Sequence, residues 1–212
     1  MTAFRPPAPE RLLLEGPAGP LEAAFEVPAD FDGQRIALVC HPHPLFGGTM
    51  DNKVVHTSAR ALQEAGYATL RFNFRGVGRS AGSWDHGRGE AEDAMAAAAA
   101  LQARWPAAGL LVAGFSFGAY VATQLASRLP LRQLITIAPP VQRFDFSTLA
   151  IPTCPWLVLQ GDQDELVDHE AVLAWTRTLE PAPTVVILSG AEHFFHGRLN
   201  DLRTALQEHL VP

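Results

Sequence analysis

The chain has 212 residues, of which 48% are hydrophobic and 18% charged, and its formal net charge at pH 7 is −6. This length favours one domain, spanning residues 1–212, with a single sizeable core. The acidic balance argues against a nucleic-acid partner and against docking on an anionic membrane surface.

The N-terminal segment, up to about residue 19, has no apolar stretch of signal-peptide length. No later window approaches the roughly 20 apolar residues of a membrane span. Cys40 and Cys154 lie in or beside apolar runs, form no CxxC pair and are interpreted as buried, reduced thiols. These features predict a cytoplasmic protein.

Short apolar runs alternate with segments of helical periodicity along most of the chain. Two runs before this alternation, at residues 11–16 and 21–27, could supply one or two antiparallel strands. Six further strands are predicted at residues 35–40, 68–74, 110–115, 134–139, 156–161 and 184–189. Helices are predicted at residues 52–66, 89–106, 118–129, 169–179 and from about 197 to 211.

Strands that alternate with helices predict a mostly parallel central sheet of about seven or eight strands, covered by helices on both faces. The expected fold class is therefore α/β, a three-layer α/β/α sandwich. Right-handed crossovers place the C-terminal ends of the parallel strands along one edge of the sheet. Functional groups of such folds gather in the loops at that edge.

The sequence GFSFG, residues 114–118, lies directly between a predicted strand and a predicted helix. It matches G-x-S-x-G, in which a sharp strand-to-helix turn holds the serine in strained geometry above the sheet. The helix N-terminus behind such a serine favours an anion. The alternative is an ordinary serine N-cap, but that role would not require both glycines. Ser116 is therefore predicted to be a nucleophile.

A serine hydroxyl needs a base to activate it, and the base needs an acid to orient it. In this connectivity the expected chain order is serine, acid, histidine. The acid candidates after Ser116 are Asp145 and, in the loop after the strand at 156–161, Asp162, Asp164, Glu165 and Asp168. Asp164 is predicted as the acid, whereas Asp162 could hold the turn together and Asp168 could cap the next helix.

His193 is predicted as the base, because it lies in the loop that follows the last strand. His196 competes for this role, but it falls at the start of the terminal helix. The position of His193 after a serine and an acid in the expected order favours it over His196.

The tetrahedral intermediate of acyl transfer needs preorganised hydrogen-bond donors. The backbone N–H of Phe117, the residue after the nucleophile, is predicted to be one donor. The other should come from the loop HPHPLFGGTMDN, residues 41–52. Since proline has no N–H, the donor is among His43, Leu45 and Phe46, and Leu45 is favoured. The HPHP pair could chelate a metal, but no nearby acid or cysteine completes a site, and none is predicted.

These pieces together resemble the α/β-hydrolase superfamily, and more closely its small lidless bacterial branch of the dienelactone-hydrolase-like type. The motifs that carry the resemblance are HPHPLFGGTMDNKVV (41–55), RFNFRGVGRSAG (71–82), GFSFGAYVA (114–122), QGDQDELV (160–167) and GAEHFFHG (190–197). The resemblance implies a Ser116–Asp164–His193 triad, no cofactor and hydrolysis through an acyl-enzyme. The HPHP loop departs from the commoner His-Gly, which leaves the second oxyanion donor open.

Cap domains in this superfamily are usually inserted after the sixth strand, but here the connecting segment, residues 140–155, is too short for one. The resemblance therefore implies an open, shallow site. Its walls are expected to include Leu45, Phe46, Phe117, Phe144, Phe146 and Phe194. Phe144 and Phe146 could equally form a surface clasp or a homodimer contact. In the loop at 71–90, Arg75, Asp85 or His86 could line the pocket, but pairing of Arg75 with an acid is the favoured interpretation.

The sequence predicts a serine hydrolase, a carboxylesterase acting on small-molecule esters or thioesters of short acyl chain. Peptidase or amidase activity, and lactone or C–C-bond hydrolysis, remain alternatives because they use the same acyl-enzyme chemistry. A third hypothesis is a non-catalytic binding protein on the α/β-hydrolase fold. Such proteins typically lose a triad member, and here all three are present.

Overall fold

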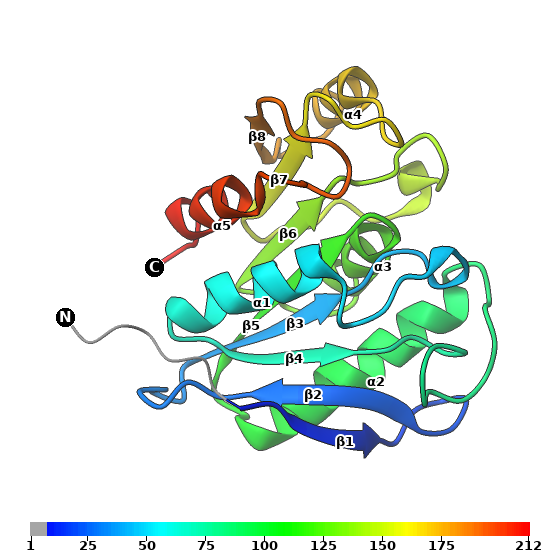
Figure 1. Cartoon of the computed structure of the whole chain (residues 1–212), viewed down its shortest axis with the longest axis vertical. Helices are drawn as coiled ribbons and strands as arrows, with labels where there is room; N and C mark the ends of the chain where they lie inside the picture. Colours follow the sequence, from blue (N-terminus) through cyan, green and yellow to red (C-terminus); the bar gives the residue numbers. More distant parts are fainter. Residues whose placement is uncertain (1–7) are drawn as a thin grey trace.

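The computed structural model describes residues 8–212, and its eight strands form one sheet (Figure 1). Residues 1–7 lie outside the described part of the chain. They belong to the N-terminal segment in which the sequence predicts no signal peptide. The strands are β1 (Glu10–Leu14), β2 (Leu21–Glu26), β3 (Arg35–Cys40), β4 (Ala68–Phe72), β5 (Gly109–Phe115), β6 (Gln133–Ile137), β7 (Trp156–Gly161) and β8 (Thr184–Leu188). Their spatial order is β1-β2-β4-β3-β5-β6-β7-β8.

The sheet is parallel from β4 to β8, as its near-continuous aliphatic runs predict. At the other edge β1 and β2 pair antiparallel, and β2 is antiparallel to β4, so both N-terminal runs are strands. In the register between β3 and β5, Cys40 lies opposite Gly114. The loop after β3 therefore starts beside the GFSFG turn.

Helices cover both faces of this sheet, which confirms the three-layer arrangement (Figure 1). They are α1 (Lys53–Glu64), α2 (Arg88–Arg104), α3 (Phe117–Ala126), α4 (His169–Thr176) and α5 (Leu199–Glu208). Side chains of α1 and α5 close one apolar core, and side chains of α2, α3 and α4 close the other. Within residues 8–212, no helix is long and apolar enough to cross a membrane.

The connection between β6 and β7 contains only a short 3-10 turn, η2 (Phe146–Thr148), so nothing there forms a cap over the sheet edge. Phe146 is 6% exposed, and its ring lies 5.2 Å from that of Tyr120 and 5.0 Å from that of Trp175. Phe144 stacks on Tyr120 at 5.0 Å. Of the two alternatives for these phenylalanines, the structure therefore favours the clasp within the chain.

The two cysteines are both unpaired thiols in the structure. Cys40 is completely buried, and burial raises its pKa far above the usual range, so it stays protonated. Cys154 is only partly buried, because it lies in the connection before β7 and not in a strand, so the interpretation as a buried thiol is right for Cys40 and wrong for Cys154.

Candidate active site

Ser116 occupies the turn between β5 and α3, where the sequence predicts a strained serine. Its backbone has φ 54° and ψ −120°, in the left-handed half of conformational space that residues with a side chain avoid. A side chain at Gly114 would overlap the Gly118 carbonyl, and one at Gly118 would overlap the carbonyls of Cys40 and His41. Both glycines are therefore needed for strand β5, helix α3 and the end of β3 to approach this closely.

Three predicted residues from three separate loops meet at this turn. Ser116 Oγ lies 3.1 Å from His193 Nε2, and His193 Nδ1 lies 2.8 Å from Asp164 Oδ2. The side chains of His193 and Asp164 are 3% and 0% exposed. This arrangement allows a proton to pass from the serine to the imidazole, with the carboxylate holding the opposite ring nitrogen.

Asp164 is held as an ionised carboxylate by several donors. The amides of Leu166 and Val167 donate to Oδ1 at 2.9 and 2.8 Å, and Gln160 Nε2 donates to Oδ2 at 3.1 Å. Burial alone would raise the Asp164 pKa, but the hydrogen bonds from His193 and from the two amides outweigh it and hold the pKa below its usual value. Gln160 is not among the residues predicted from the sequence, although an amide side chain inside the otherwise apolar strand run WLVLQG points to a buried polar contact.

The alternative acids and bases have other roles. Asp162 accepts the Gly190 N–H at 2.6 Å and so ties its loop to the loop that carries His193. Asp168 caps α4 by accepting the Glu170 N–H, as predicted. His196 is exposed and faces Glu192 instead of the serine.

The backbone amides of the 41–48 loop differ in what they already bind. Leu45, the favoured oxyanion donor, gives its N–H to His43 Nδ1 at 3.2 Å. Phe46 gives its N–H to the His43 carbonyl at 3.1 Å. In the described part of the chain, the His43 amide donates to no group, and Phe117 is the first residue of α3, where amides have no partner within the helix.

His41 anchors the start of this loop from inside the protein. Its Nδ1–H donates to the Pro42 carbonyl at 2.6 Å, and its Nε2 accepts the Phe74 N–H at 3.0 Å. Both ring nitrogens are thus engaged, so His41 cannot join His43 in chelating a metal. Burial lowers the pKa of His41 to about 3, which keeps the ring neutral.

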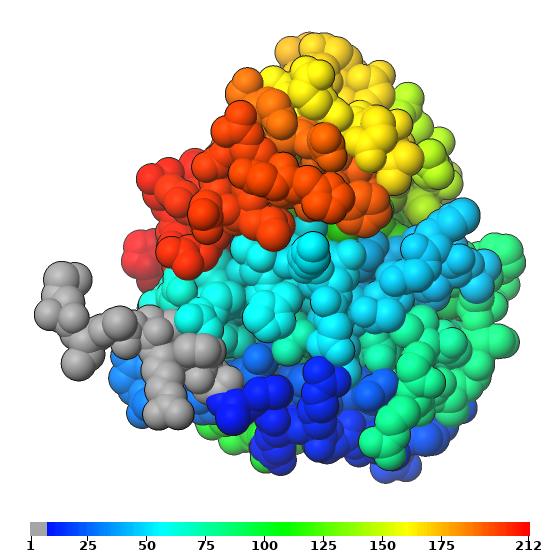
Figure 2. All heavy atoms as spheres, in the orientation of Figure 1, coloured from blue at the N-terminus to red at the C-terminus, as the bar shows by residue number. Residues whose placement is uncertain are grey.

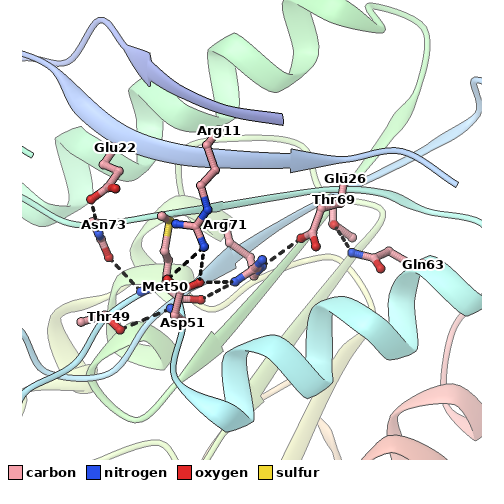
Figure 3. A network of polar contacts seen from close by, with 10 residues as sticks. All are labelled: Arg11, Glu22, Glu26, Thr49, Met50, Asp51, Gln63, Thr69, Arg71 and Asn73. Carbon is pink, nitrogen blue, oxygen red and sulfur yellow. Dashed lines mark hydrogen bonds and ion pairs between the residues drawn. The ribbon is translucent and has the colours of Figure 1, made fainter. Parts of the chain in front are cut away.

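The far end of the same loop is clamped by two residues of the segment that begins with β4 (Figure 3). Asn73 Oδ1 accepts the Met50 N–H at 2.8 Å, and Arg71 Nη1 donates to the Met50 carbonyl at 2.7 Å. The Arg71 side chain is 2% exposed, and its charge is balanced by Glu26 at 3.0 Å and by Asp51 at 3.1 Å. The loop beside Ser116 is therefore fixed at both ends.

Because His41 is buried as a neutral ring, the free energy of unfolding should decrease as the pH is lowered. Because the His41 pKa is lower in the folded than in the unfolded protein, the unfolded state binds the extra proton below about pH 6.5. We expect this group alone to remove roughly 1.6 kcal/mol of unfolding free energy between pH 6.5 and pH 5, with a slope that approaches about 1.4 kcal/mol per pH unit below pH 5.5.

Urea unfolding at both pH values would measure this dependence in the wild type, His41→Gln and the exposed-histidine control His196→Gln. The pH dependence should shrink in His41→Gln and persist in His196→Gln. An equal pH dependence in all three proteins would contradict the assignment.

In the loop at 71–90, Arg75 pairs with an acid, as the sequence predicts, and does not line the pocket. Arg75 pairs with the buried Asp93, with its Nη2 2.8 Å from Oδ1 and its Nε 2.9 Å from Oδ2. Glu90 lies in the first turn of α2 and accepts the amides of Asp85 and Gly87. Neither Arg75, Asp85 nor His86 lines the pocket at Ser116.

The pocket at Ser116 has a volume of about 300 Å³. Of the predicted wall residues, Phe46, Phe117, Phe144 and Phe194 line it. Leu45 and Phe146 do not: Leu45 is 65% exposed on the outside of its turn, and Phe146 is buried beneath. Figure 2 shows the orange segment near residue 195 lying beside the light-blue segment near residue 50 on this face of the molecule.

Comparison with known proteins gives a consistent assignment. A family model described as an alpha/beta hydrolase domain matches residues 38–210. A crystal structure from Xanthomonas campestris, described as an α/β serine hydrolase without a lid, is 50% identical with a TM-score of 0.91, covering 98% of this chain and 95% of that one. An α/β serine hydrolase homologue from Coxiella burnetii is 44% identical with a TM-score of 0.92, covering 100% of both chains. An uncharacterized protein of Rickettsia prowazekii is 39% identical, over 95% of this chain and 88% of its own length.

Proposed function

This chain belongs to the α/β-hydrolase family and is a hydrolase, and on that premise we propose that it is a carboxylesterase that cleaves small esters or thioesters. The observation that carries the proposal is the continuous contact from Ser116 Oγ to His193 (3.1 Å) and from His193 to Asp164 (2.8 Å). This is the arrangement that nucleophilic acyl transfer requires of a serine, a base and an orienting acid. We take residues 1–212 as one catalytic domain.

In the proposed mechanism, Ser116 Oγ attacks the ester carbonyl while its proton moves to His193 Nε2. The tetrahedral intermediate then collapses, and His193 returns the proton to the departing alcohol or thiol. Water then attacks the acyl carbonyl and gives a proton to His193; the second tetrahedral intermediate collapses, the acid leaves, and His193 returns that proton to Ser116 Oγ. Throughout, Asp164 accepts the Nδ1–H bond, which fixes the tautomer and stabilises the imidazolium.

The Phe117 amide is proposed as one oxyanion donor. For the second, the contacts favour the His43 amide over that of Leu45, which would first have to release His43 Nδ1. Gly118 supports this pairing, because its lack of a side chain lets the start of α3 approach the backbone at Cys40 and His41. An oxyanion donor must have an N–H that is not already hydrogen-bonded to another group of the protein, and this condition favours the His43 amide.

A panel of substrates with a common leaving group would test the proposal. We expect the protein to react with a fluorophosphonate probe and to hydrolyse 4-nitrophenyl esters of short acids fastest, since the pocket holds about 300 Å³. The matching thioester should follow and the matching anilide should react least. A fast anilide would indicate the amidase alternative. A folded protein that neither reacts with the probe nor cleaves any of the panel would contradict the esterase proposal and favour the binding protein.

A further inference from the structure

The pocket at Ser116 is lined mainly by aromatic rings and aliphatic groups, and its polar side chains offer hydrogen-bond donors but no carboxylate. Apart from Ser116 and His193, the polar lining side chains are His43, Asn52 and Arg143. No aspartate or glutamate from the described residues lines it. With one arginine and no acidic side chain, this lining favours a substrate that carries negative charge.

All three of these side chains are left with donors to offer. Asn52 Oδ1 accepts the Val54 N–H at 2.9 Å as the cap of α1, which leaves its amide NH2 for a ligand. His43 Nδ1 accepts the Leu45 N–H, so the proton of the neutral ring lies on Nε2. Arg143 has only donors. A lining of donors without a carboxylate suits a ligand rich in acceptor oxygens.

Arg143 also has no internal counter-ion. Within residues 8–212, no carboxylate lies within 4.0 Å of its guanidinium. The nearest acid in sequence, Asp145, turns its Oδ1 to the N–H and the hydroxyl of Ser147, at 2.9 and 2.6 Å, and does not pair with Arg143. By contrast, Arg75 and Arg128 each pair with an acid. In a chain of net charge −6, one cation is left unpaired at the pocket.

The backbone beneath Arg143 is held in place. The amides of Arg143 and Phe144 both donate to the Pro140 carbonyl, at 3.0 and 3.1 Å. The Phe144 ring lies 5.3 Å from that of Phe117 and 5.0 Å from that of Tyr120. The guanidinium therefore extends from a fixed turn at the pocket edge, not from a free loop.

The charge of Arg143 also reaches the inner lining. Burial lowers the His43 pKa, and the positive charge of Arg143 lowers it further. His43 is thus kept neutral at physiological pH, and Arg143 remains the one fixed positive charge among the lining residues.

We propose that Arg143 is a specificity-determining residue and that the substrate is an ester that carries a carboxylate on an otherwise apolar body. The guanidinium pairs with the carboxylate, while the apolar body contacts the rings of Phe117, Phe144 and Phe194. This inference rests on the proposed esterase function, because it concerns the substrate of the same pocket.

Two pairs of rigid substrates would test it, each differing only in a carboxylate or a carboxamide. The first pair is 4-acetoxybenzoate and 4-acetoxybenzamide, which carry the group on the leaving side. The second is the 4-nitrophenyl esters of 4-carboxybenzoate and 4-carbamoylbenzoate, which carry it on the acyl side. We expect kcat/KM to favour the anion in at least one pair, by roughly three- to tenfold at low salt. The preference should decrease as salt is added.

Arg143→Gln should abolish this preference and Arg143→Glu should reverse it, whereas Arg177→Gln, an exposed arginine at the end of α4, should retain it. Equal kcat/KM for anion and amide in both wild-type pairs, or a preference unchanged in Arg143→Gln, would overturn the proposal while the esterase function stands. If the wild type cleaves none of the four esters and does not react with the fluorophosphonate probe, the esterase function itself fails.

Discussion

Replacing Ser116 by alanine is expected to lower kcat for ester hydrolysis by roughly 10⁵- to 10⁶-fold and to abolish fluorophosphonate labelling. Alanine has no oxygen that could form the acyl-enzyme, so His193 has no nucleophile to activate at 3.1 Å. A small residual rate over water should remain, because the pocket and the proposed oxyanion donors are left intact. Steady-state kinetics with a 4-nitrophenyl ester and mass spectrometry of the labelled protein measure both effects.

Ser127→Ala provides the matched control, since Ser127 is an exposed serine at the opposite end of the same helix. It should label and turn over like the wild type. If Ser116→Ala still forms a covalent adduct with the probe, or retains more than a few per cent of the wild-type kcat, another nucleophile is at work.

Replacing Asp164 by asparagine is expected to lower kcat by about 10⁴-fold with little change in fold. An amide NH2 facing Nδ1 would make that nitrogen an acceptor, so the ring proton would move to Nε2. A protonated Nε2 cannot take the proton of Ser116. The wild-type carboxylate avoids this, because its lowered pKa keeps it charged across the range in which histidine side chains titrate.

The matched variant is Asp162→Asn, two residues earlier in the same loop. Asparagine keeps an Oδ1 that can accept the Gly190 N–H, so we expect a loss of only a few-fold. Measuring kcat against pH for both variants separates the two roles. A loss in Asp162→Asn as large as that in Asp164→Asn would show that the acid has been misassigned.

Much of the fold could be predicted because its signals are local. Continuous aliphatic runs such as RIALVC and LLVAGF predict strands buried on both faces, and both are central strands of the sheet. Likewise, the two glycines around Ser116 predict a turn at which chain segments cross closely, and the overlaps that a side chain would cause at each explain why. The strand runs and the Gly114–Gly118 approach depend on residues close in sequence, whereas the approach of Gly118 to the Cys40 and His41 carbonyls is signalled only by the glycine itself.

The candidate site was only partly predictable, because some of its contacts join distant segments. Leu45 is the donor that the sequence favours, yet its amide binds the ring of His43; this contact is local, but it depends on the side-chain rotamer at the η1 turn (Pro44–Phe46), which the residue pattern does not give. Gln160 and Arg143 were not singled out. The sequence shows that one lies in a strand and the other in a loop, but not that Gln160 donates to Asp164 or that Arg143 has no carboxylate beside it.

By itself, the sequence determined the alternation of strands and helices, the strained serine turn and the chain order of serine, acid and histidine. It also favoured Asp164 over Asp162 as the acid, and the structure places Asp164 against His193 and Asp162 against the Gly190 N–H, a contact that only the tertiary structure reveals. Tertiary structure alone decided which amides are left unoccupied and that Arg143 has no internal counter-ion. The reason is physical: periodicity and turn chemistry act within one segment, whereas hydrogen bonds and ion pairs need atoms within a few ångströms, and only the folded chain brings these loops that close.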